Sequence, residues 1–539
     1  VLLVRNKKEF RALGSRCPHY GAPLSKGVLR GERLRCPWHG ACFNIRTGDI
    51  EEYPSLDCLP CFEVTVQDGR VFVTAKKKVL TLPAVTEHGQ HLGPGMISAF
   101  LIFFQDLESS LRVKDTSRRC LLNCNTVLLL GGGVAALVCA ETLRQEGFTG
   151  RIIMATKEKH VPFDKSKLSK EMHLRAEETY LRKPEFLKAR GIEVWTEKEA
   201  VSVDFQKQKV HFMDGSSQKY HQLLVATGSH SSFLKVPGAD LQNVCILQSP
   251  EDSRKILELA TGKNLVIVGA SFVGTRPDQA SRHPAPGRDT AGASLQPGAA
   301  AELLCLGFGW IKLFSQQHSL EFPSEHSNQL PLPFQMLQNR GVKFYMKTEL
   351  SELKGRDGQV AEAVLDSGEN LPADVVVVGI GVFPNSAFLK GTSIATDDSG
   401  AILVDLHMQT NIPNVFAAGD VVSFPVALLN GDHSSIHHQQ VAEAHGHIAA
   451  LNMLKKEQEL HTVPYFWTTM LGKSIRYAGC GKGYTDTVVK GSLEQQKFLI
   501  FYIRDGIVTA AASLNCDPMV SLIAEVLYLG KQISKEEAE

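Results

Sequence analysis

Long hydrophobic runs are missing from this chain, and so is a strong excess of charge of either sign. The nearest approach to a membrane span, from Met96 to Phe104, is about half of the roughly 18 residues that such a helix requires, so we expect no transmembrane span. A formal net charge of +1 argues against binding of nucleic acid, which needs a large basic excess. The 12 cysteines are too sparse for a secreted disulfide scaffold, which favours a reducing compartment with some thiolates bound to metal.

The length and composition indicate several globular domains. A chain of 539 residues is too long for one hydrophobic core, and its apolar share of 43% and charged share of 21% are ordinary for globular proteins. Val1 is not an initiator methionine and lies inside a strand-like run. We therefore expect the natural N-terminus, with any targeting peptide, to precede it.

Two short segments near the N-terminus each combine one cysteine with one histidine. They are Cys17-Pro-His19 and Cys36-Pro-Trp-His39-Gly40. Their Pro and Gly residues favour tight turns, in which backbone N–H groups can point at the sulfurs. In a Rieske-type [2Fe–2S] cluster two thiolates hold one iron and two imidazoles hold the other. Structural zinc is the alternative, but zinc fingers pair cysteine with cysteine, so we interpret Cys17, His19, Cys36 and His39 as Rieske ligands.

The sequence around these ligands, over 17–24 and 36–48, resembles Rieske ferredoxins. High-potential respiratory Rieske proteins carry an extra cysteine in each loop, and these two cysteines form a disulfide. Ala22 and Trp38 hold the corresponding places here, so the resemblance implies a disulfide-free cluster of the lower-potential type. Cys58-Leu-Pro-Cys61 has the spacing of a redox motif, but it leads into a strand rather than a helix, and we interpret it as incidental.

A dinucleotide-binding pattern begins at Thr126. An apolar run typical of a buried parallel strand meets Gly131-Gly-Gly133-Val-Ala-Ala136, and a helix-period stretch and a second strand then lead to Glu158. The glycines let the backbone approach a pyrophosphate at the helix N-terminus, and the small Ala136 lets helix and strand pack closely. Strand, helix, strand and acid in this order predict dinucleotide binding.

Three later segments indicate which dinucleotide this is. Ala226-Thr227-Gly228 and then Ala418-Gly419-Asp420 follow the fingerprint. This order resembles the FAD-dependent pyridine-nucleotide reductases over roughly residues 125–455, in which Asp420 would hydrogen-bond the ribityl chain. Residues 161–170 resemble a segment of ferredoxin reductases and apoptosis-inducing factors, which implies that Lys170 lies close to the flavin and that Lys165 replaces an arginine. That segment has no cysteine pair, so electrons would leave the flavin singly for a metal centre, a quinone or oxygen.

The second nucleotide site is irregular in sequence. A strand from Asn264 leads to Gly269, Ser271 and Gly274, with Ser271 in the place of the middle glycine. Residues 275–300 should form a helix, yet they contain four prolines and no apolar period. Either this segment is a functional insertion or a splicing or gene-model error has altered the chain. We favour the error, and expect impaired NAD(P)H binding by the chain as written.

The remainder of this nucleotide site is only partly regular. The glutamate that faces the nicotinamide in relatives would be Thr275 or a neighbour, or else Glu302 beyond the segment. Helix-like sequence resumes over 299–306, and 310–314 reads as the next strand. The later strand that leads to Gly379 and Gly381 is intact.

The C-terminal part resembles the reductase C-terminal domain, whose aromatic segment packs near the isoalloxazine. That segment is Pro464-Tyr-Phe-Trp467, and alternating strands and a final helix follow it. We interpret the adjacent His437 and His438 as lining the flavin pocket or the interface beneath it, rather than as a metal or acid–base site.

The whole order of modules resembles the Rieske-containing apoptosis-inducing-factor-like proteins, apart from segments near 80–122 and 275–335. The resemblance implies a mitochondrial location and a link to apoptosis. We predict an all-β Rieske domain, an α/β two-dinucleotide-binding flavoprotein fold and an α+β C-terminal domain. The predicted divisions are a Rieske domain (1–80), a linker (81–123), an FAD domain (124–262 and 386–455), an NAD(P) domain (263–385) with an irregular insertion (275–300) and a C-terminal domain (456–539).

The predicted function is that of an FAD-dependent oxidoreductase that passes electrons between NAD(P)H, FAD and the [2Fe–2S] cluster. Its electron acceptor is unidentified, and a homodimer is a candidate assembly. One alternative is a pro-apoptotic or redox-sensing interaction protein with little catalysis, because the second nucleotide segment is disrupted. Another is a reductase component that feeds a separate Rieske oxygenase. The predicted site residues are Lys170 as catalytic; Gly131, Gly133, Ala136, Glu158, Lys165, Lys170, Ala226, Thr227, Gly228, Gly419 and Asp420 for FAD; and Gly269, Ser271, Gly274, Gly379 and Gly381 for NAD(P)H.

Overall fold

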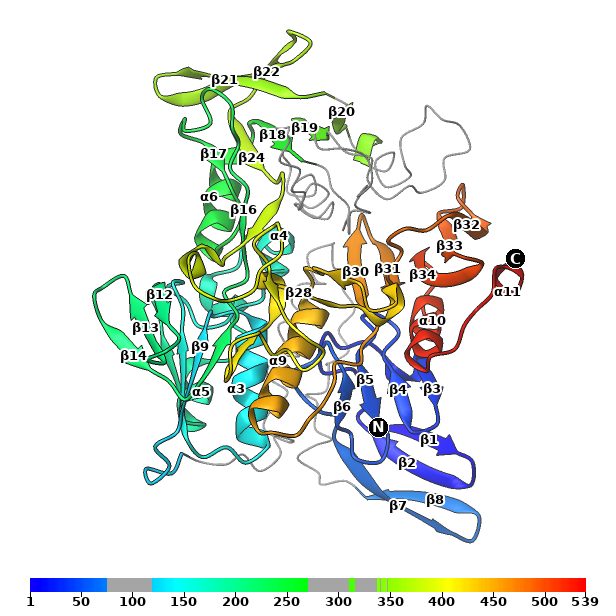
Figure 1. The fold of residues 1–539 in the computed structure, drawn as a ribbon. Helices are drawn as coiled ribbons and strands as arrows, with labels where there is room; N and C mark the ends of the chain where they lie inside the picture. Colours follow the sequence, from blue (N-terminus) through cyan, green and yellow to red (C-terminus); the bar gives the residue numbers. More distant parts are fainter. Residues whose placement is uncertain (75–118, 270–309, 316–336, 340, 347) are drawn as a thin grey trace, which may run out of the picture.

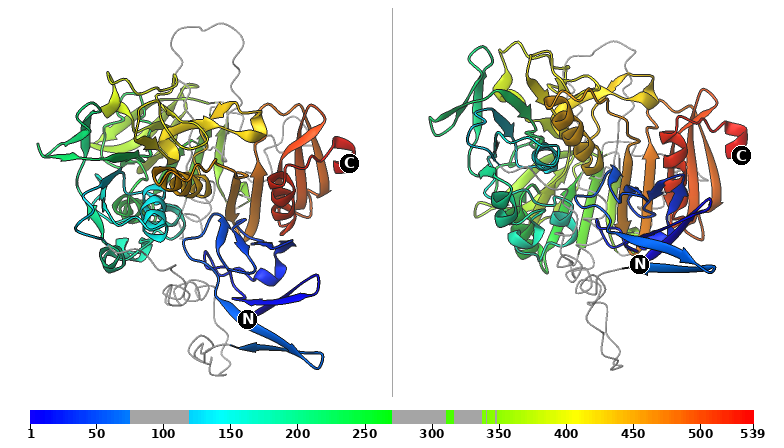
Figure 2. Two further views of the ribbon diagram at one scale, coloured as in Figure 1. Left: turned by 60° about the horizontal axis from the view of Figure 1, so that its bottom comes forward. Right: turned by 90° about the horizontal axis from the view of Figure 1, so that it is seen from below.

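The structure is a computed structural model that describes residues 1–74, 119–269, 310–315, 337–339, 341–346 and 348–539. In Figure 1 and both views of Figure 2, the blue N-terminal strands lie against the orange and red elements of the C-terminal part. The gold helix α9 (Gln439–Met453) lies beside the same strands. The first and last parts of the sequence are therefore neighbours in space.

The N-terminal part is all β, as its resemblance to Rieske proteins implies. It has two four-stranded antiparallel sheets and one 3₁₀ turn, η1 (Leu24–Lys26). The first sheet, in the order β1-β2-β7-β8, consists of β1 (Leu2–Asn6), β2 (Glu9–Leu13), β7 (Cys61–Gln67) and β8 (Arg70–Thr74). The second sheet, in the order β3-β4-β5-β6, consists of β3 (Val28–Arg30), β4 (Arg33–Arg35), β5 (Cys42–Asn44) and β6 (Ile50–Glu52).

A parallel five-stranded sheet forms the core of the second part. It consists, in spatial order, of β11 (Ile192–Trp195), β10 (Arg151–Ala155), β9 (Thr126–Leu130), β15 (Gln222–Val225) and β27 (Val415–Ala417). Every residue of β9 is buried, which its unbroken apolar run predicts. Around this sheet lie α3 (Val134–Gln145), α4 (Lys167–Lys170), η3 (Ala176–Thr179), α5 (Pro184–Ala189), the antiparallel strands β12 (Ala200–Asp204), β13 (Lys209–Phe212) and β14 (Ser217–Lys219), and α9.

Short elements complete this flavoprotein-like part around β27. They are η4 (Ala387–Leu389), β26 (Ile402–Leu403), η5 (Gly419–Val421), β28 (Val422–Pro425), η6 (Ala427–Leu429) and β29 (His433–Ser434). Helix α9 packs closely on α3 because Gly446 has no side chain, and a Cβ there would lie 2.1 Å from the Ala135 carbonyl oxygen. That packing fixes the start of α3, where the first fingerprint lies.

The third part repeats the parallel arrangement. Its sheet consists, in order, of β17 (Val244–Cys245), β24 (Val375–Val378), β18 (Asn264–Val268), β19 (Trp310–Ser315) and β20 (Lys343–Met346), flanked by α6 (Pro250–Ala260). A three-stranded sheet of β21 (Leu350–Arg356), β22 (Gln359–Leu365) and β23 (Asn370–Pro372) adjoins it, and β16 (Ser229–Ser231) pairs with β25 (Val382–Pro384). The strand expected over 310–314 is confirmed by β19, parallel to β18. The helix expected over 299–306 and the segment 275–300 lie outside the described residues.

The C-terminal part is an antiparallel sheet with one long and one short helix. The sheet consists, in order, of β30 (Tyr465–Met470), β31 (Lys473–Gly479), β34 (Ile507–Leu514), β33 (Lys497–Arg504) and β32 (Asp486–Ser492). The helices are α10 (Met519–Tyr528) and α11 (Lys535–Ala538). Throughout the described residues, no helix is long and apolar enough to cross a membrane. The limits placed on each domain from the sequence stay predictions.

Candidate functional site

The four predicted metal ligands converge at the end of the N-terminal domain. The loop that follows β2 carries Cys17 and His19, and the turn between β4 and β5 carries Cys36 and His39. The two cysteine side chains are hydrogen-bonded to each other, and the Nδ1 atoms of the two histidines face each other at 3.0 Å. Thiols thus pair with thiols and imidazoles with imidazoles, although each loop supplies one of each.

The surroundings of this quartet suit metal ligation. Burial raises the pKa of the Cys17 thiol, and the adjacent Cys36 raises it further, because two buried thiolates repel each other unless a cation lies between them. Burial also lowers the pKa of His19 to about 4, so its ring is neutral near pH 7 and free to donate a lone pair. Backbone N–H groups of residues 19 and 20 bond to the sulfur of Cys17, as the turn residues predict.

The four side chains face each other as one thiol pair and one imidazole pair, an arrangement that fits a two-iron cluster. Structural zinc would need all four ligands around one centre, whereas a Rieske cluster takes two thiolates on one iron and two imidazoles on the other. The two facing pairs therefore fit the cluster. All eleven described cysteines, Cys58 and Cys61 included, are free of disulfides.

The first fingerprint forms an anion cradle at the N-terminus of α3. A Cβ on Gly131 would lie 2.0 Å from the carbonyl oxygen of Ala226, and the backbone φ of Gly131 is +121°, so only glycine fits there. Gly133 caps α3 without any side-chain hydrogen bond, and nothing lies within 4 Å of where its Cβ would be. The first-turn N–H groups of α3 are therefore available to a phosphate, which fits the pyrophosphate of FAD. Ala136 is fully buried on the same helix.

The remaining residues predicted for FAD surround this cradle unevenly. Ser229 follows Gly228 and donates to Oδ2 of Asp420 at 3.2 Å, which joins the crossover segment to the second fingerprint. The Nζ of Lys170 donates to Oγ1 of Thr468 at 3.1 Å, so the C-terminal domain positions this lysine. Glu158 is half-buried just beyond β10, whereas the side chain of Lys165 is exposed. Thr227 donates to the Asn385 carbonyl at 2.7 Å, and Gly419 has a φ of +79°.

The second nucleotide site repeats the geometry of the first as far as it is described. A Cβ on Gly269 would lie 2.0 Å from the carbonyl oxygen of Gly379, which matches the contact between Gly131 and Ala226. The Gly379 N–H donates to the Val268 carbonyl at 2.7 Å, and Gly381 accepts from the Ser232 N–H at 2.7 Å. Ser271, Gly274, Thr275 and Glu302 lie outside the described residues.

An aromatic side chain connects the metal ligands to the flavin residues. The ring of Trp467 stacks on that of His39, with centroids 4.7 Å and planes 28° apart. The next residue, Thr468, holds Lys170. On the other side His438 meets Trp467 edge to face at 4.6 Å, and burial lowers the pKa of His438 to about 3. The same strand, β30, therefore contacts both a predicted cluster ligand and Lys170.

Several residues at this junction were missed in the sequence. Tyr20 donates to Oδ2 of Asp164 at 2.7 Å and so joins the first ligand loop to the Lys170 segment. Arg182 bonds Asp57 of the N-terminal domain at 3.0 Å and Glu141 of α3 at 2.8 Å. The adjacency of Tyr20 to His19 was the one available signal, because Tyr20 and Asp164 are 144 residues apart and Arg182 and Asp57 are 125 apart.

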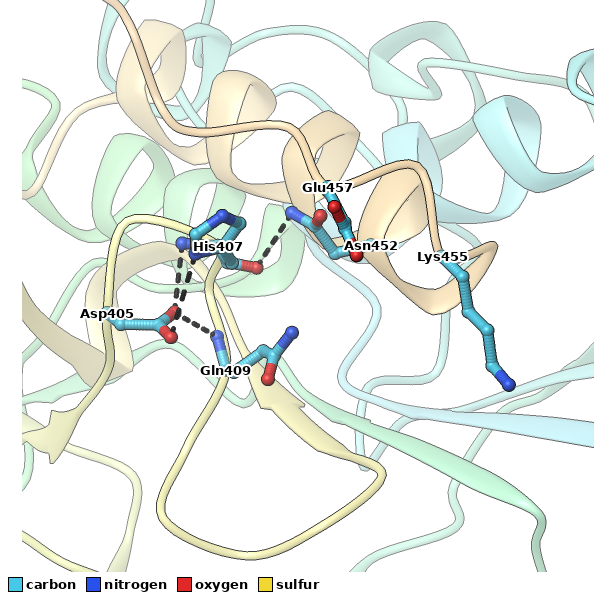
Figure 3. A pocket seen from close by; sticks show the side chains of 6 residues that line it. All are labelled: Asp405, His407, Gln409, Asn452, Lys455 and Glu457. Atoms are coloured by element: carbon cyan, nitrogen blue, oxygen red, sulfur yellow. Dashed lines mark hydrogen bonds and ion pairs between the residues drawn. The ribbon is translucent and has the colours of Figure 1, made fainter.

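The two adjacent histidines have separate positions. His438 lies in the junction as expected, whereas His437 is exposed. A cavity of about 530 Å³ lies elsewhere, and Figure 3 shows that Asp405, His407, Gln409 and Asn452 of its lining bond to one another. Asp405 accepts from the backbone N–H groups of His407 and Gln409, both at 2.9 Å, and Asn452 donates to the His407 carbonyl at 3.1 Å. These bonds stabilise a turn, and we assign the cavity no redox role.

Comparisons with protein families agree with this architecture. The model of the Rieske [2Fe–2S] domain matches residues 1–63, and that of the reductase C-terminal domain matches 465–539. The model of the pyridine nucleotide-disulphide oxidoreductases matches 125–276 and 327–446. That match is interrupted over 277–326, where the sequence is irregular.

Individual relatives extend the likeness over the full chain. Apoptosis-inducing factor 3 of Homo sapiens is 43% identical over 539 residues, which cover all of this chain and 82% of that protein. The ferredoxin–NAD(+) reductase component of the biphenyl dioxygenase system of Paraburkholderia xenovorans is 26% identical over 77% of this chain and 96% of its own length. Among solved structures, the ferredoxin reductase of the CYP199A2 system of Rhodopseudomonas palustris matches with a TM-score of 0.67 and 24% identity, over 77% of this chain and 97% of that one.

Proposed function

We propose that this chain passes single electrons from FAD to its own Rieske cluster across Trp467. The chain belongs to the apoptosis-inducing factor 3 family of Rieske-containing pyridine nucleotide-disulphide oxidoreductases. The family makes it an NAD(P)H-dependent oxidoreductase with FAD and a [2Fe–2S] cluster. The observation that carries the proposal is the stack of Trp467 on His39, next to the Thr468 that holds Lys170.

The roles of the protein groups follow from their positions. FAD supplies the conversion of a two-electron hydride transfer into single-electron steps, and the cluster carries one electron at a time. The N-terminus of α3 behind Gly131 and Gly133 would hold the pyrophosphate, Asp420 would orient the flavin chain, and Lys170 would stabilise negative charge near the ring. Trp467 covers His39, which is only 9% exposed, and would keep water from that cluster ligand.

The residues of each site are part of the proposal. We assign Cys17, His19, Cys36 and His39 to the cluster. We assign to FAD the residues Gly131, Gly133, Ala136, Glu158, Lys165, Lys170, Ala226, Thr227, Gly228, Gly419 and Asp420. To NAD(P)H we assign Gly269, Ser271, Gly274, Gly379 and Gly381.

The test is anaerobic titration of the purified holoprotein with NADH and, separately, NADPH. We expect the flavin absorbance to bleach with at least one of them, and a reduced Rieske signal then to appear in the EPR spectrum. Bleaching without any cluster signal would contradict transfer to the cluster. No bleaching with either nucleotide would contradict the hydride step.

A second candidate function is favoured by the interruption of the family match over 277–326. In that case the chain is a pro-apoptotic or redox-sensing interaction protein with slow catalysis, and we propose for it the mitochondrial location that the family resemblance implies. Cell death on expression would then survive the Asp420→Ala change, which removes flavin binding. If the first function holds and the segment is spurious, deletion of 275–300 should restore nucleotide-driven flavin reduction. A homodimer is a further proposal that light scattering tests.

A further inference from the structure

The N-terminal domain is joined to helix α10 by four charged side chains, Arg33, Arg35, Glu52 and Glu525, which we call the charge latch. Glu525 is the one member of the latch that comes from the C-terminal domain. Its Oε1 accepts from Nε of Arg33 at 2.7 Å, and its Oε2 accepts from Nε of Arg35 at 2.9 Å. Arg35 is only 1% exposed and Glu525 2% exposed, so these bonds are shielded from water and salt.

One face of α10 contributes all of these contacts. Glu525 and Tyr528 are three residues apart, and the ring of Tyr528 lies 3.8 Å from Cζ of Arg33. Ser521, four residues before Glu525, donates to the backbone carbonyl of Cys36 at 3.0 Å. Burial alone would raise the pKa of Glu525, but its hydrogen bonds and ion pairs with both arginines lower the pKa instead. The Glu525 carboxylate is therefore ionised at neutral pH. Through Ser521, helix α10 also contacts the second ligand loop directly.

The FAD domain holds the opposite side of the N-terminal domain. The bonds of Tyr20 to Asp164 and of Arg182 to Asp57 are made there, and Glu443 of α9 accepts from the Ser55 N–H at 3.1 Å. The histidine side of the ligand quartet points into this junction, and His39 is only 9% exposed under Trp467. The surface around Trp467 and Lys170 is thus covered by the chain's own domain.

We propose that the charge latch holds the Rieske domain as a fixed cover over the electron exit of the flavin, so that a separate electron-carrier protein cannot take electrons from the flavin directly. This inference rests on the proposed function, since it takes transfer from FAD to the cluster as given. For each NAD(P)H oxidised, two electrons pass singly through the cluster and reduce two molecules of a one-electron carrier. Such a carrier docks on the Rieske domain, never on the flavoprotein face.

The test uses the full-length holoprotein, a latch variant and a matched control. Glu525→Lys sets a third cation against two arginines and opens the latch by charge repulsion. Glu258→Lys makes the same charge change at an exposed site on α6. The flavin is reduced photochemically, which bypasses the nucleotide site, and oxidised cytochrome c is then added at rising concentrations as the carrier.

In the wild type and in Glu258→Lys, we expect the rate of flavin reoxidation to level off at high cytochrome c concentration, because the internal transfer from flavin to cluster then limits it. In Glu525→Lys it should rise in proportion to that concentration and exceed the wild-type rate at least tenfold at the highest one. A wild-type rate that keeps rising in proportion to cytochrome c concentration overturns the proposal, and so does a rate in Glu525→Lys that levels off as in the wild type.

Two further measurements keep the outcome decisive. If Glu525→Lys loses its flavin absorbance or its Rieske EPR signal, Glu525→Gln replaces it, with a smaller but still concentration-dependent rise expected. Hydrogen exchange of β4 and α10 shows whether the latch has opened, and an opened latch without that rise overturns the proposal. Failure of the proposed function looks different, because the wild-type flavin would then be reduced while its own cluster never gives an EPR signal.

Discussion

A single buried carboxylate should make the stability of this protein fall as the pH rises. Burial raises the pKa of Glu443 to about 8, against an ordinary value of 4.5, and the nearby Asp164 acts in the same direction. Hydrogen bonds from Gln439 and from the Ser55 N–H and the charge of Arg182 oppose this rise without cancelling it. Glu443 is therefore protonated in the folded protein at neutral pH, although it is ionised in the unfolded chain.

The sign of the effect follows from proton binding. Between pH 4.5 and pH 8 the folded state binds more protons at Glu443 than the unfolded state, so the free energy of unfolding decreases as the pH rises. The full loss is about 5 kcal/mol, because each pKa unit corresponds to roughly 1.4 kcal/mol. About 3 kcal/mol of it falls between pH 6 and pH 9.

The assay is urea unfolding of the wild type, Glu443→Gln and Glu457→Gln at pH 6 and pH 9. Glutamine keeps an oxygen for the Ser55 N–H but has no proton to lose, so the Glu443→Gln protein should lack about 3 kcal/mol of the wild-type pH dependence. Glu457 is exposed just beyond α9, and its variant should follow the wild type. Parallel pH profiles for the wild type and Glu443→Gln would refute the reasoning.

Three other predictions concern the cofactors. Gly131→Ala should yield protein without flavin absorbance, because it adds about 1–3 kcal/mol of backbone strain and places a Cβ 2.0 Å from the Ala226 carbonyl oxygen. The control Gly147→Ala changes a glycine with a φ of +96° in open space, and this variant should keep its flavin. Cys17→Ser should abolish the Rieske EPR signal while nucleotide still bleaches the flavin, and Cys120→Ser, at an exposed thiol, should retain both. In stopped-flow measurements, Trp467→Ala should slow cluster reduction on the order of 100-fold and leave the rate of flavin bleaching unchanged. Trp467→Phe should recover part of the rate of cluster reduction. Equal cluster reduction in both Trp467 variants would contradict a bridging role.

Local sequence patterns predicted the elements and their order, but not how the domains face one another. The unbroken apolar run of β9 and the following glycines specify a buried strand and its turn through short-range sterics, and the structure has both. The conformation of the two ligand loops also depends on local sequence, because their Pro and Gly residues favour tight turns. The contact of Arg35 with Glu525 joins residues 490 positions apart. No periodicity encodes such a pair, because its stability depends on burial that only the docked domains create.

The charged residues of the latch show the same limit. No local sequence pattern indicates a role for Arg33 or Arg35, whereas the structure buries Arg35 almost completely between two domains. Trp467 was predicted near the flavin from resemblance alone, and its stack on His39 was not foreseen. The segment 275–300 stays a prediction, since it lies outside the described residues.

The central claim is that electrons pass from FAD to the cluster within one molecule. The most direct test follows flavin oxidation and cluster reduction after a brief anaerobic photoreduction of the holoprotein, over a hundredfold range of protein concentration. The account predicts that the Rieske signal appears at a first-order rate that does not change with protein concentration. A rate that rises in proportion to protein concentration would contradict it, because electrons would then pass between molecules.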